Sequence, residues 1–254
     1  MNNIKKKLSM HIERKDQISC ITCYDASFCK ILSESNVDIV LVGDSLGMVI
    51  KGEENTHNVK IDEILYHTKC VSAHKKNFIL MVDMPINSYS NPEISVLNAK
   101  KILDTNADII KIEYKDEHRN VVENFISKNI PVCAHLGYLP QFANKKEDTR
   151  IYGKDEAEHN QIFTQAKTLE NIGVDIILLE CVDSNLSKLI TDSLNIPVIG
   201  IGSGENCNGQ VQVLYDIIGI SKNPPRFAKD YLKDSNSVAE AINKFCNYVK
   251  EIKY

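Results

Sequence analysis

Three segments of the chain repeat one short pattern, an apolar run of β-branched residues and leucine that ends in a carboxylate. They are residues 37–44 (VDIVLVGD), 107–113 (ADIIKIE) and 174–180 (VDIILLE). Each follows a helix-like stretch that ends in a turn residue, namely Asn36, Asn106 or Gly173. Continuous apolar runs of this length are typical of strands buried on both faces, as in parallel sheets. The repeat therefore predicts an α/β fold.

Further short apolar runs lie between and around the repeats and bring the strand candidates to eight. They are residues 18–24, 78–83, 131–135, 197–201 and 217–220. The intervening segments with helical spacing are 61–73, 92–103, 121–128, 157–172, 185–193 and 237–250. Pro92 suits the first turn of its helix, where a backbone N–H is not needed. A chain of 254 residues would also accommodate two small domains, but eight strand–helix units without a long linker favour a single (β/α)8 barrel, a TIM barrel, over residues 1–254.

The N-terminal segment predicts a short amphipathic helix, because its apolar residues Ile4, Leu8, Met10 and Ile12 recur at helical spacing. Such a helix would cap one end of the barrel. Basic residues interrupt this segment, so it lacks the apolar centre of a signal peptide, and no run approaches the roughly 18 apolar residues of a membrane span. A net charge of −4, from 30 basic and 34 acidic residues, gives no hint of a basic face for nucleic acid. We therefore expect neither a membrane nor a nucleic acid as partner.

Eight cysteines are spread along the chain. In a chain of this length without a secretion signal, they predict free thiols, buried or half-buried, in a reducing cytoplasm. Cys20 and Cys23 match the C-x-x-C spacing, but they lie in an apolar strand-like run, and no second pair completes a zinc site. We therefore interpret them as core residues of a cytoplasmic protein.

Titratable side chains stand at the carboxyl ends of five predicted strands, which is the end where (β/α)8 barrels carry out their chemistry. They are Asp44, Asp83, Lys111 with Glu113, His135 and Glu180, and Ser45 follows Asp44 directly. A single carboxylate at a strand end could simply meet solvent. Repetition over five strands favours a functional site.

The carboxylates at these strand ends suggest a metal. Asp44 and Asp83 are hard oxygen ligands, and with water and substrate oxygens they suit octahedral Mg²⁺. Glu113 could be a third ligand or could hold a metal-bound water. We expect all three carboxylates to converge at the open mouth of the barrel, near enough to share one cation.

Lys111 lies two residues before Glu113, so both side chains point to the same face of their strand. A substrate carboxylate is the natural anion for this lysine. Two alternatives are a Schiff-base lysine, as in class I aldolases, and a structural ion pair with a neighbouring carboxylate.

Three further features lie at or directly after predicted strand ends. His135 could hydrogen-bond to a ligand, orient a carboxylate or be a core residue. Glu180 is the best candidate for the acid–base group, because partial desolvation raises the pKa of a carboxylate towards working pH. The glycine turn at residues 200–204 (GIGSG) permits close approach by a ligand, although a tight strand-to-helix turn explains it equally well.

Several blocks of the sequence resemble the ketopantoate hydroxymethyltransferase family. They are residues 41–48 (LVGDSLGM), 66–67 (YH), 83–85 (DMP), 111–113 (KIE), 131–137 (PVCAHLG), 179–181 (LEC), 196–202 (IPVIGIG) and 225–228 (PRFA), in the family's order. The block around Asp44 is specific to the family. Its combination with the blocks around Lys111 and His135 leaves little room for coincidence.

The resemblance implies a barrel of the phosphoenolpyruvate/pyruvate type that transfers a hydroxymethyl group from 5,10-methylenetetrahydrofolate to 3-methyl-2-oxobutanoate, giving 2-dehydropantoate for pantothenate synthesis. It implies Mg²⁺ ligands at Asp44 and Asp83, with Glu113 in or beside the coordination sphere, and a metal-stabilised enolate of the oxo acid. Ser45 and Lys111 would contact the substrate carboxylate, and Glu180 would be the proton acceptor.

The resemblance also implies a high-order homo-oligomer, often a decamer. Residues 144–153 depart from the family's glycine-rich pattern, in a loop that we expect to cover the mouth. Two other functions stay open from the residues alone. One is a Mg²⁺-dependent 2-oxo acid lyase or mutase of the phosphoenolpyruvate/pyruvate barrels, and the other is a barrel that binds a ligand without turnover. A requirement for folate would distinguish the transferase from both.

Overall fold

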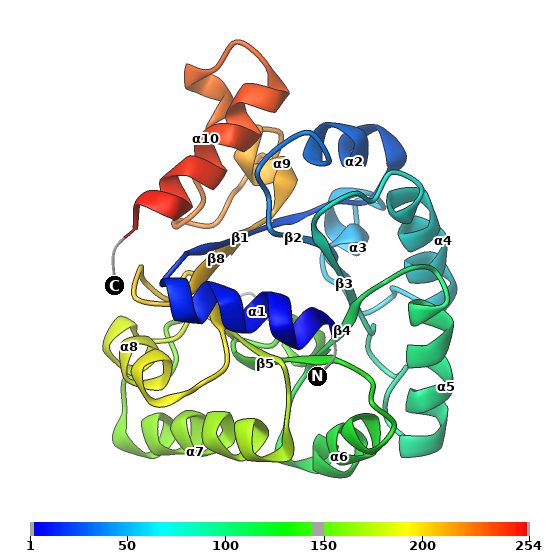
Figure 1. Cartoon of the computed structure of the whole chain (residues 1–254), viewed down its shortest axis with the longest axis vertical. Helices are drawn as coiled ribbons and strands as arrows, with labels where there is room; N and C mark the ends of the chain where they lie inside the picture. Colours follow the sequence, from blue (N-terminus) through cyan, green and yellow to red (C-terminus); the bar gives the residue numbers. More distant parts are fainter. Residues whose placement is uncertain (1–2, 144–149, 253–254) are drawn as a thin grey trace.

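Eight parallel strands close into a barrel in the computed structural model, which describes residues 3–143 and 150–252 (Figure 1). The strands are β1 (Ile18–Thr22), β2 (Ile39–Val42), β3 (Ile79–Asp83), β4 (Ile109–Glu113), β5 (Val132–Gly137), β6 (Ile176–Glu180), β7 (Val198–Ile201) and β8 (Gly209–Gln212). Each pairs with the next in chain order, and β8 pairs with β1. The predicted (β/α)8 barrel is confirmed.

Helices surround the strands (Figure 1). They are α1 (Asn3–Arg14), α2 (Ala26–Leu32), α3 (Leu46–Val49), α4 (Ile61–Ser72), α5 (Pro92–Leu103), α6 (Arg119–Ser127), α7 (Glu156–Ile172), α8 (Ser184–Ser193), α9 (Leu214–Ile217) and α10 (Val238–Glu251). Short 3-10 turns are η1 (Asp116–His118), η2 (Pro140–Phe142) and η4 (Leu232–Asp234). As the sequence predicts, α5 begins at Pro92, and Asn91 caps it by accepting the backbone N–H groups of the first turn.

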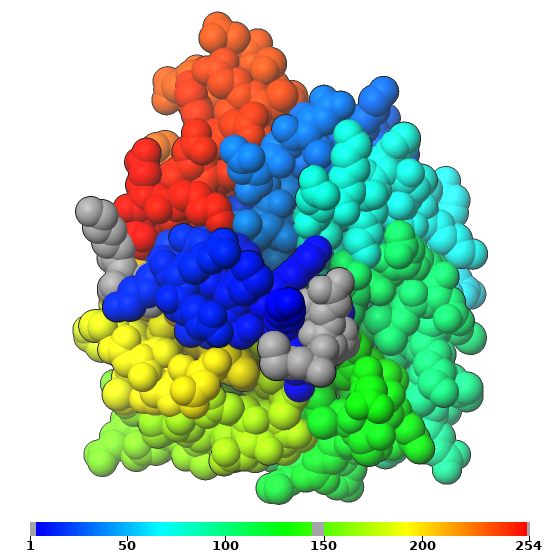
Figure 2. Space-filling model, viewed as in Figure 1, coloured from blue at the N-terminus to red at the C-terminus, as the bar shows by residue number. Residues whose placement is uncertain are grey.

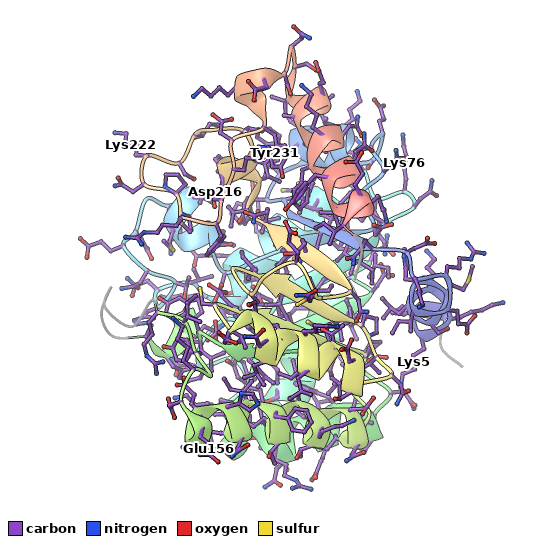
Figure 3. The ribbon with its side chains drawn as sticks, turned by 90° about the vertical axis from the view of Figure 1, so that its left-hand side faces the viewer. Lys5, Lys76, Glu156, Asp216, Lys222 and Tyr231 are labelled. Carbon is purple, nitrogen blue, oxygen red and sulfur yellow. The ribbon has the colours of Figure 1, made fainter. Side chains whose placement is uncertain are left out.

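The N-terminal helix α1 closes one end of the barrel. Leu8 is 2% exposed and packs in the same cluster as the strand residues that fill the barrel interior, with Ile4 beside it. Figure 2 shows the helix lying across one face of the molecule, and Figure 3 shows it nearly end-on, on the opposite side from the loop that carries Lys222. The interior is therefore sealed by apolar contacts at the amino ends of the strands, which leaves the carboxyl ends for chemistry.

The aspartates of the sequence repeat have a structural role at the closed end. The residue directly before each even-numbered strand uses its side chain to accept a backbone N–H from the preceding, odd-numbered strand. The pairs are Asp38 with Ser19 (2.8 Å), Asp108 with Leu80 (2.8 Å), Asp175 with Val132 (2.9 Å) and Asn208 with Val198 (2.9 Å). The three aspartates also face lysines, namely Lys250 (2.5 Å), Lys75 (2.6 Å) and Lys5 (3.7 Å). These bonds satisfy backbone donors that the ladder leaves free at the strand ends.

The prediction of a strand at residues 217–220 is wrong. Ile217 ends the short helix α9, and the eighth strand is Gly209–Gln212, a few residues earlier. Gln210 and Gln212 are half-buried, so β8 lacks the continuous apolar signal of the other strands. Ile217 and Ile218 are apolar because they pack in the layer between strands and helices, where a helical turn buries them equally well.

All eight cysteines are free thiols, and all are buried except Cys70, which is half-buried. Cys20 and Cys23 lie in and directly after β1 and belong to the core, as the sequence predicts. Within residues 3–143 and 150–252, no helix has the length and apolar character needed to cross a membrane. Most of the loop predicted to cover the mouth, residues 144–149, lies outside the described residues.

Candidate active site

The predicted site residues stand at the carboxyl ends of five neighbouring strands. Asp44 and Ser45 follow β2, Asp83 ends β3, Lys111 and Glu113 lie on β4, His135 lies on β5, and Glu180 ends β6. Asp44, Asp83, Lys111, Glu113 and His135 are each at most 5% exposed. Solvation at the strand ends therefore does not explain these charges, because water scarcely reaches them.

Lys111 forms an ion pair with Asp83 across adjacent strands. The ammonium Nζ lies 2.5 Å from Asp83 Oδ1, and the strand register places these two residues opposite one another. Burial lowers the pKa of Lys111, but the carboxylates of Asp83, Asp44 and Glu113 outweigh burial and raise it above its ordinary value. Lys111 is therefore a cation held among acidic groups. The structure thus contains the ion pair with a neighbouring carboxylate. A charged amine is a poor Schiff-base nucleophile.

Asp83 also fixes the start of the loop after β2. Its Oδ2 accepts the backbone N–H of Asp44 at 3.1 Å. A Cβ added to Gly43 would lie 2.8 Å from Ser45 Oγ and 3.4 Å from Asp83 Oδ2, so the glycine lets the chain pass close to both side chains. Ser45 Oγ in turn lies 2.8 Å from the hydroxyl of the buried Tyr24. The loop thus presents Asp44 and Ser45 together at the mouth.

Burial of Asp44 and Glu113 makes ionisation of their carboxyl groups unfavourable. Burial first, and then the charge of Asp83, raise the pKa of Asp44 to about 7. Burial, with Asp44 as the next cause, raises the pKa of Glu113 well above its ordinary range. Both carboxylates accept hydrogen bonds from Gln141, a residue of η2 that our sequence reasoning missed.

His135 lies between two carboxylates. Its Nε2 is 3.3 Å from Glu180 Oε2, and its Nδ1 is 3.9 Å from Glu113 Oε1, yet neither ring nitrogen makes a well-formed hydrogen bond. Burial, followed by the charge of Lys111, lowers the pKa of His135 well below its ordinary value, so the ring is neutral. A neutral ring carries one N–H and can donate to only one carboxylate at a time.

Glu180 is the most accessible acid of the set, with 19% of its side chain exposed. Burial raises its pKa to about 7, although Lys111 opposes the shift. The next residue, Cys181, has a φ of 52°, which is the left-handed region that costs a non-glycine residue energy. Backbone strain directly after Glu180 is typical of a functional site.

The donor set fits a hard divalent cation through Asp44 and Asp83, with Glu113 beside them. The carboxylates are buried, and the raised pKa values of Asp44 and Glu113 mean that Lys111 alone does not stabilise their ionised forms, which a cation would do. The expectation that three carboxylates share one cation is not met in this structure. Among the described residues, no group of three His, Cys, Asp or Glu side chains is arranged to hold a metal ion. Two carboxylates with water and substrate oxygens are the arrangement that Mg²⁺ commonly uses.

The glycine turn after β7 is explained by packing. Gly202 has a φ of 61°, and a Cβ added to it would lie 2.6 Å from the ring of Phe227. The space over this glycine is therefore filled by an aromatic side chain from the loop before η4. Of the two interpretations of the turn, the local structural one accounts for Gly202.

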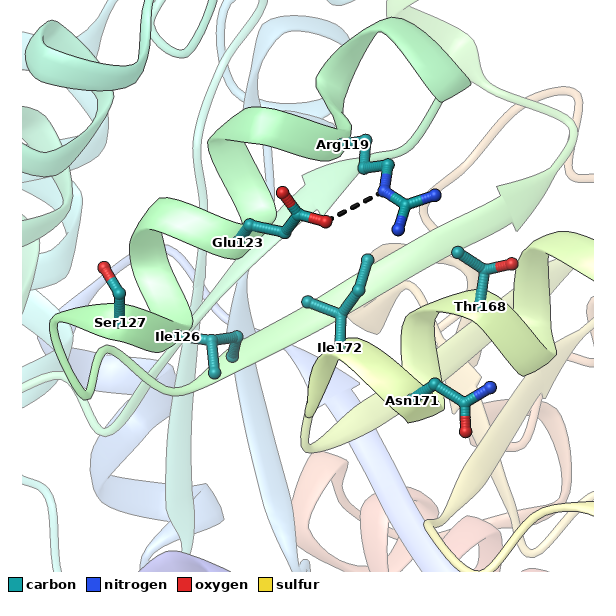
Figure 4. A pocket seen from close by; sticks show the side chains of 7 residues that line it. All are labelled: Arg119, Glu123, Ile126, Ser127, Thr168, Asn171 and Ile172. Carbon is teal, nitrogen blue, oxygen red and sulfur yellow. Dashed lines mark hydrogen bonds and ion pairs between the residues drawn. The ribbon is translucent and has the colours of Figure 1, made fainter.

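A surface groove of about 550 Å³ lies between α6 and α7 on the outside of the barrel (Figure 4). Its lining residues are Arg119, Glu123, Ile126, Ser127, Thr168, Asn171 and Ile172. Arg119 and Glu123 pair at 2.8 Å within one helix. None of the predicted site residues lines this groove, so it is separate from the strand-end cluster.

Comparison with solved structures identifies proteins that have the same fold. The fold is similar to that of 2,3-dimethylmalate lyase, a PEP mutase/isocitrate lyase superfamily member, with a TM-score of 0.60 and 11% identity over 83% of this chain and 78% of that chain. It is also similar to phosphonopyruvate hydrolase in complex with oxalate and Mg²⁺, with a TM-score of 0.63 and 11% identity over 83% and 80% of the two chains. The chain thus shares the (β/α)8 barrel fold of these two proteins.

Sequence comparison identifies the family of the chain. The family model for ketopantoate hydroxymethyltransferase matches residues 3–254, and the chain belongs to this family. The 3-methyl-2-oxobutanoate hydroxymethyltransferase of Ruthia magnifica subsp. Calyptogena magnifica is 42% identical over 93% of this chain and 91% of its own length. The resemblance noted in the sequence is confirmed.

Proposed function

We propose that the chain transfers a hydroxymethyl group from 5,10-methylenetetrahydrofolate to 3-methyl-2-oxobutanoate and produces 2-dehydropantoate, a step of pantothenate synthesis. The observation that carries the proposal is a buried cluster of carboxylates and one lysine at the barrel mouth, in a chain 42% identical to an enzyme named for this reaction. Such a cluster would be costly in a barrel that only binds a ligand.

Asp44 and Asp83 would hold Mg²⁺, with Glu113 in or beside the coordination sphere. A bound Mg²⁺ supplies Lewis acidity, which favours loss of the C3 proton of a 2-oxo acid. A barrel of similar fold has been solved with oxalate and Mg²⁺, and oxalate carries adjacent oxygens like those of a 2-oxo acid, which supports a Mg²⁺ and oxo-acid site in this fold.

Lys111 and Ser45 would bind the substrate carboxylate. Lys111 is charged and buried, and it has further N–H donors besides the one directed at Asp83 Oδ1, since an ammonium carries three. Ser45 is oriented by Tyr24 across a 2.8 Å contact. Together they would fix the oxo acid with its C3 facing the mouth.

Glu180 would accept or return the proton at the reacting carbon. A pKa of about 7 suits this role, since such a carboxylate is an effective base near neutral pH. His135 would contact the substrate and restrict the rotation of Glu180 through the 3.3 Å approach of its Nε2.

We also propose a cytoplasmic homo-oligomer, with the decamer of the resembling family as the expected size. Large apolar side chains on the outer faces of α4 and α5 support an interface between copies, since Tyr66, Ile94 and Leu97 are 66%, 52% and 61% exposed. Sedimentation equilibrium tests this proposal, and a monomeric mass would contradict it.

The decisive experiment is an assay for ketopantoate with the purified protein, with and without Mg²⁺ and with and without 5,10-methylenetetrahydrofolate. Product that requires both additions supports the proposal. Cleavage or rearrangement of an oxo acid without folate, and no ketopantoate with it, would instead identify a lyase or mutase.

A further inference from the structure

Gln141 lies in the loop after β5, and every polar atom of its side chain is engaged. The residue is 1% exposed. Its Nε2 donates to Asp44 Oδ2 at 2.8 Å and to the backbone carbonyl of Met84 at 3.0 Å. Its Oε1 accepts the hydroxyl of Tyr89 at 2.6 Å. Its backbone N–H donates to Glu113 Oε2 at 3.0 Å.

The orientation of this amide follows from its partners. On one side lies the backbone carbonyl of Met84, which can only accept, so the NH₂ group must face Met84 and, beside it, Asp44. On the other side lies the Tyr89 hydroxyl, which is buried and can donate to the amide oxygen. The hydrogen-bond partners therefore fix the orientation of the amide, with Nε2 towards Asp44 and Oε1 towards Tyr89.

Gln141 thus donates hydrogen bonds to two carboxylates that come from separate strands. The side chain holds Asp44 after β2, and the backbone of the same residue holds Glu113 at the end of β4. An amide provides these donors without adding charge. A lysine or arginine at this position would neutralise the carboxylates and compete with any bound cation.

We propose that Gln141 is a positioning residue, which orients Asp44 towards a divalent cation shared with Asp83 and fixes Glu113 beside that site. Tyr89 sets the amide so that it faces Asp44. This inference rests on the proposed function, because it assumes a cation at the strand ends and assigns to a loop residue the role of orienting the carboxylates there. Partners that orient metal ligands in this way typically contribute about 10–100-fold to metal affinity.

The test measures binding of Mn²⁺ alone by electron paramagnetic resonance, without substrate or turnover. Gln141→Met keeps the length of the side chain and removes its hydrogen bonds. We expect its Kd for Mn²⁺ to rise by about 10–100-fold over the natural chain. The matched control is Gln165→Met, because Gln165 on α7 also donates from Nε2 to an aspartate, Asp116, at 3.1 Å, but on the outer surface. We expect no change in its Kd.

A purely structural role for Gln141 predicts a lower melting temperature with an unchanged Kd for Mn²⁺, and that result would overturn the inference. If Gln141→Met does not fold, Tyr89→Phe replaces it, because this variant keeps the amide and removes only the hydroxyl that orients it. A several-fold weaker Mn²⁺ affinity is then expected, and an unchanged affinity again overturns the inference. Failure of the natural chain to bind Mn²⁺ or Mg²⁺ at all would instead count against the proposed metal-dependent function.

Discussion

Replacing Glu180 by Gln should stabilise the fold while removing activity. The carboxylate is largely withdrawn from water at the barrel mouth, and burial raises its pKa from 4.5 to about 7. Each tenfold change in proton affinity corresponds to about 1.4 kcal/mol, so ionised Glu180 costs the folded chain about 3 kcal/mol. Some exposure of the side chain, 19%, screens part of this cost, and we expect a value between about 1 and 3 kcal/mol.

The size of this stability cost depends on pH. The folded chain holds the proton of Glu180 more tightly than the unfolded chain, so ionisation lowers stability as pH rises above 4.5. The cost is absent below this pH and complete above about pH 7. Because glutamine does not titrate, the stability advantage of Glu180→Gln over the natural chain should grow through this window and then level off.

Urea denaturation at several pH values from 4.5 to 8.5, in EDTA, measures this advantage. The control is Glu156→Gln, since Glu156 is an exposed residue on the outer helix α7, far from the strand-end cluster (Figure 3). A stability difference for Glu180→Gln that stays flat from pH 4.5 to 8.5 would refute the claim that this carboxylate is held at a cost.

Three further predictions concern the reaction. The kcat/KM of the natural chain should rise with pH and level off above about 7, because Glu180 must be ionised to accept a proton; a flat profile from pH 5.5 to 8 would exclude it as the base. Asp83→Ala should abolish Mg²⁺-dependent ketopantoate formation while circular dichroism shows a folded barrel, and near-normal turnover would remove Asp83 from the ligand set. Lys111→Ala should weaken binding of 3-methyl-2-oxobutanoate by about 10–100-fold, measured by calorimetry, since a hydrogen bond to a charged group contributes about 1.5–3 kcal/mol; unchanged affinity would leave Lys111 with only its ion pair to Asp83.

The fold was predictable where strands are buried on both faces, because such strands read as unbroken apolar runs. The segments that became β4 and β6 are examples, and their burial is complete or nearly so. β8 was misplaced because its two glutamines are half-buried and interrupt the pattern. The aspartates of the repeat were visible in the sequence, but their bonds to the neighbouring strand depend on register, which no local pattern encodes.

The site was predictable where charge follows an apolar run, as at Asp83 and Glu113. Gln141 gave no such signal, because it is a neutral residue in a loop without periodicity. Its partners Tyr89 and Asp44 lie 52 and 97 residues away in the chain. Contacts of this separation are set by closure of the barrel. The position of Gln141 in the loop after β5 was the one available clue.

The repeat unit of β4 carries two acidic residues with opposite energetic roles. Asp108 at its start accepts the N–H of Leu80 at 2.8 Å and pairs with Lys75 at 2.6 Å, so its charge is compensated. Glu113 at its end is 1% exposed, and burial and Asp44 raise its pKa well above the ordinary range. The change from carboxylate to amide should therefore have opposite signs at the two ends of one strand.

At pH 8 in EDTA, we expect Asp108→Asn to lower the free energy of unfolding by about 1–3 kcal/mol, because a charged hydrogen bond and an ion pair are lost. Glu113→Gln should raise it, because ionisation of a buried acid no longer opposes folding. Only the second variant should lose activity, since Asp108 lies at the closed end of the barrel. Urea denaturation of both variants in one buffer provides the measurement. Stability changes of the same sign would mean that the mouth carboxylates are as well compensated as those at the closed end, and the case for a cation between them would lose its electrostatic basis.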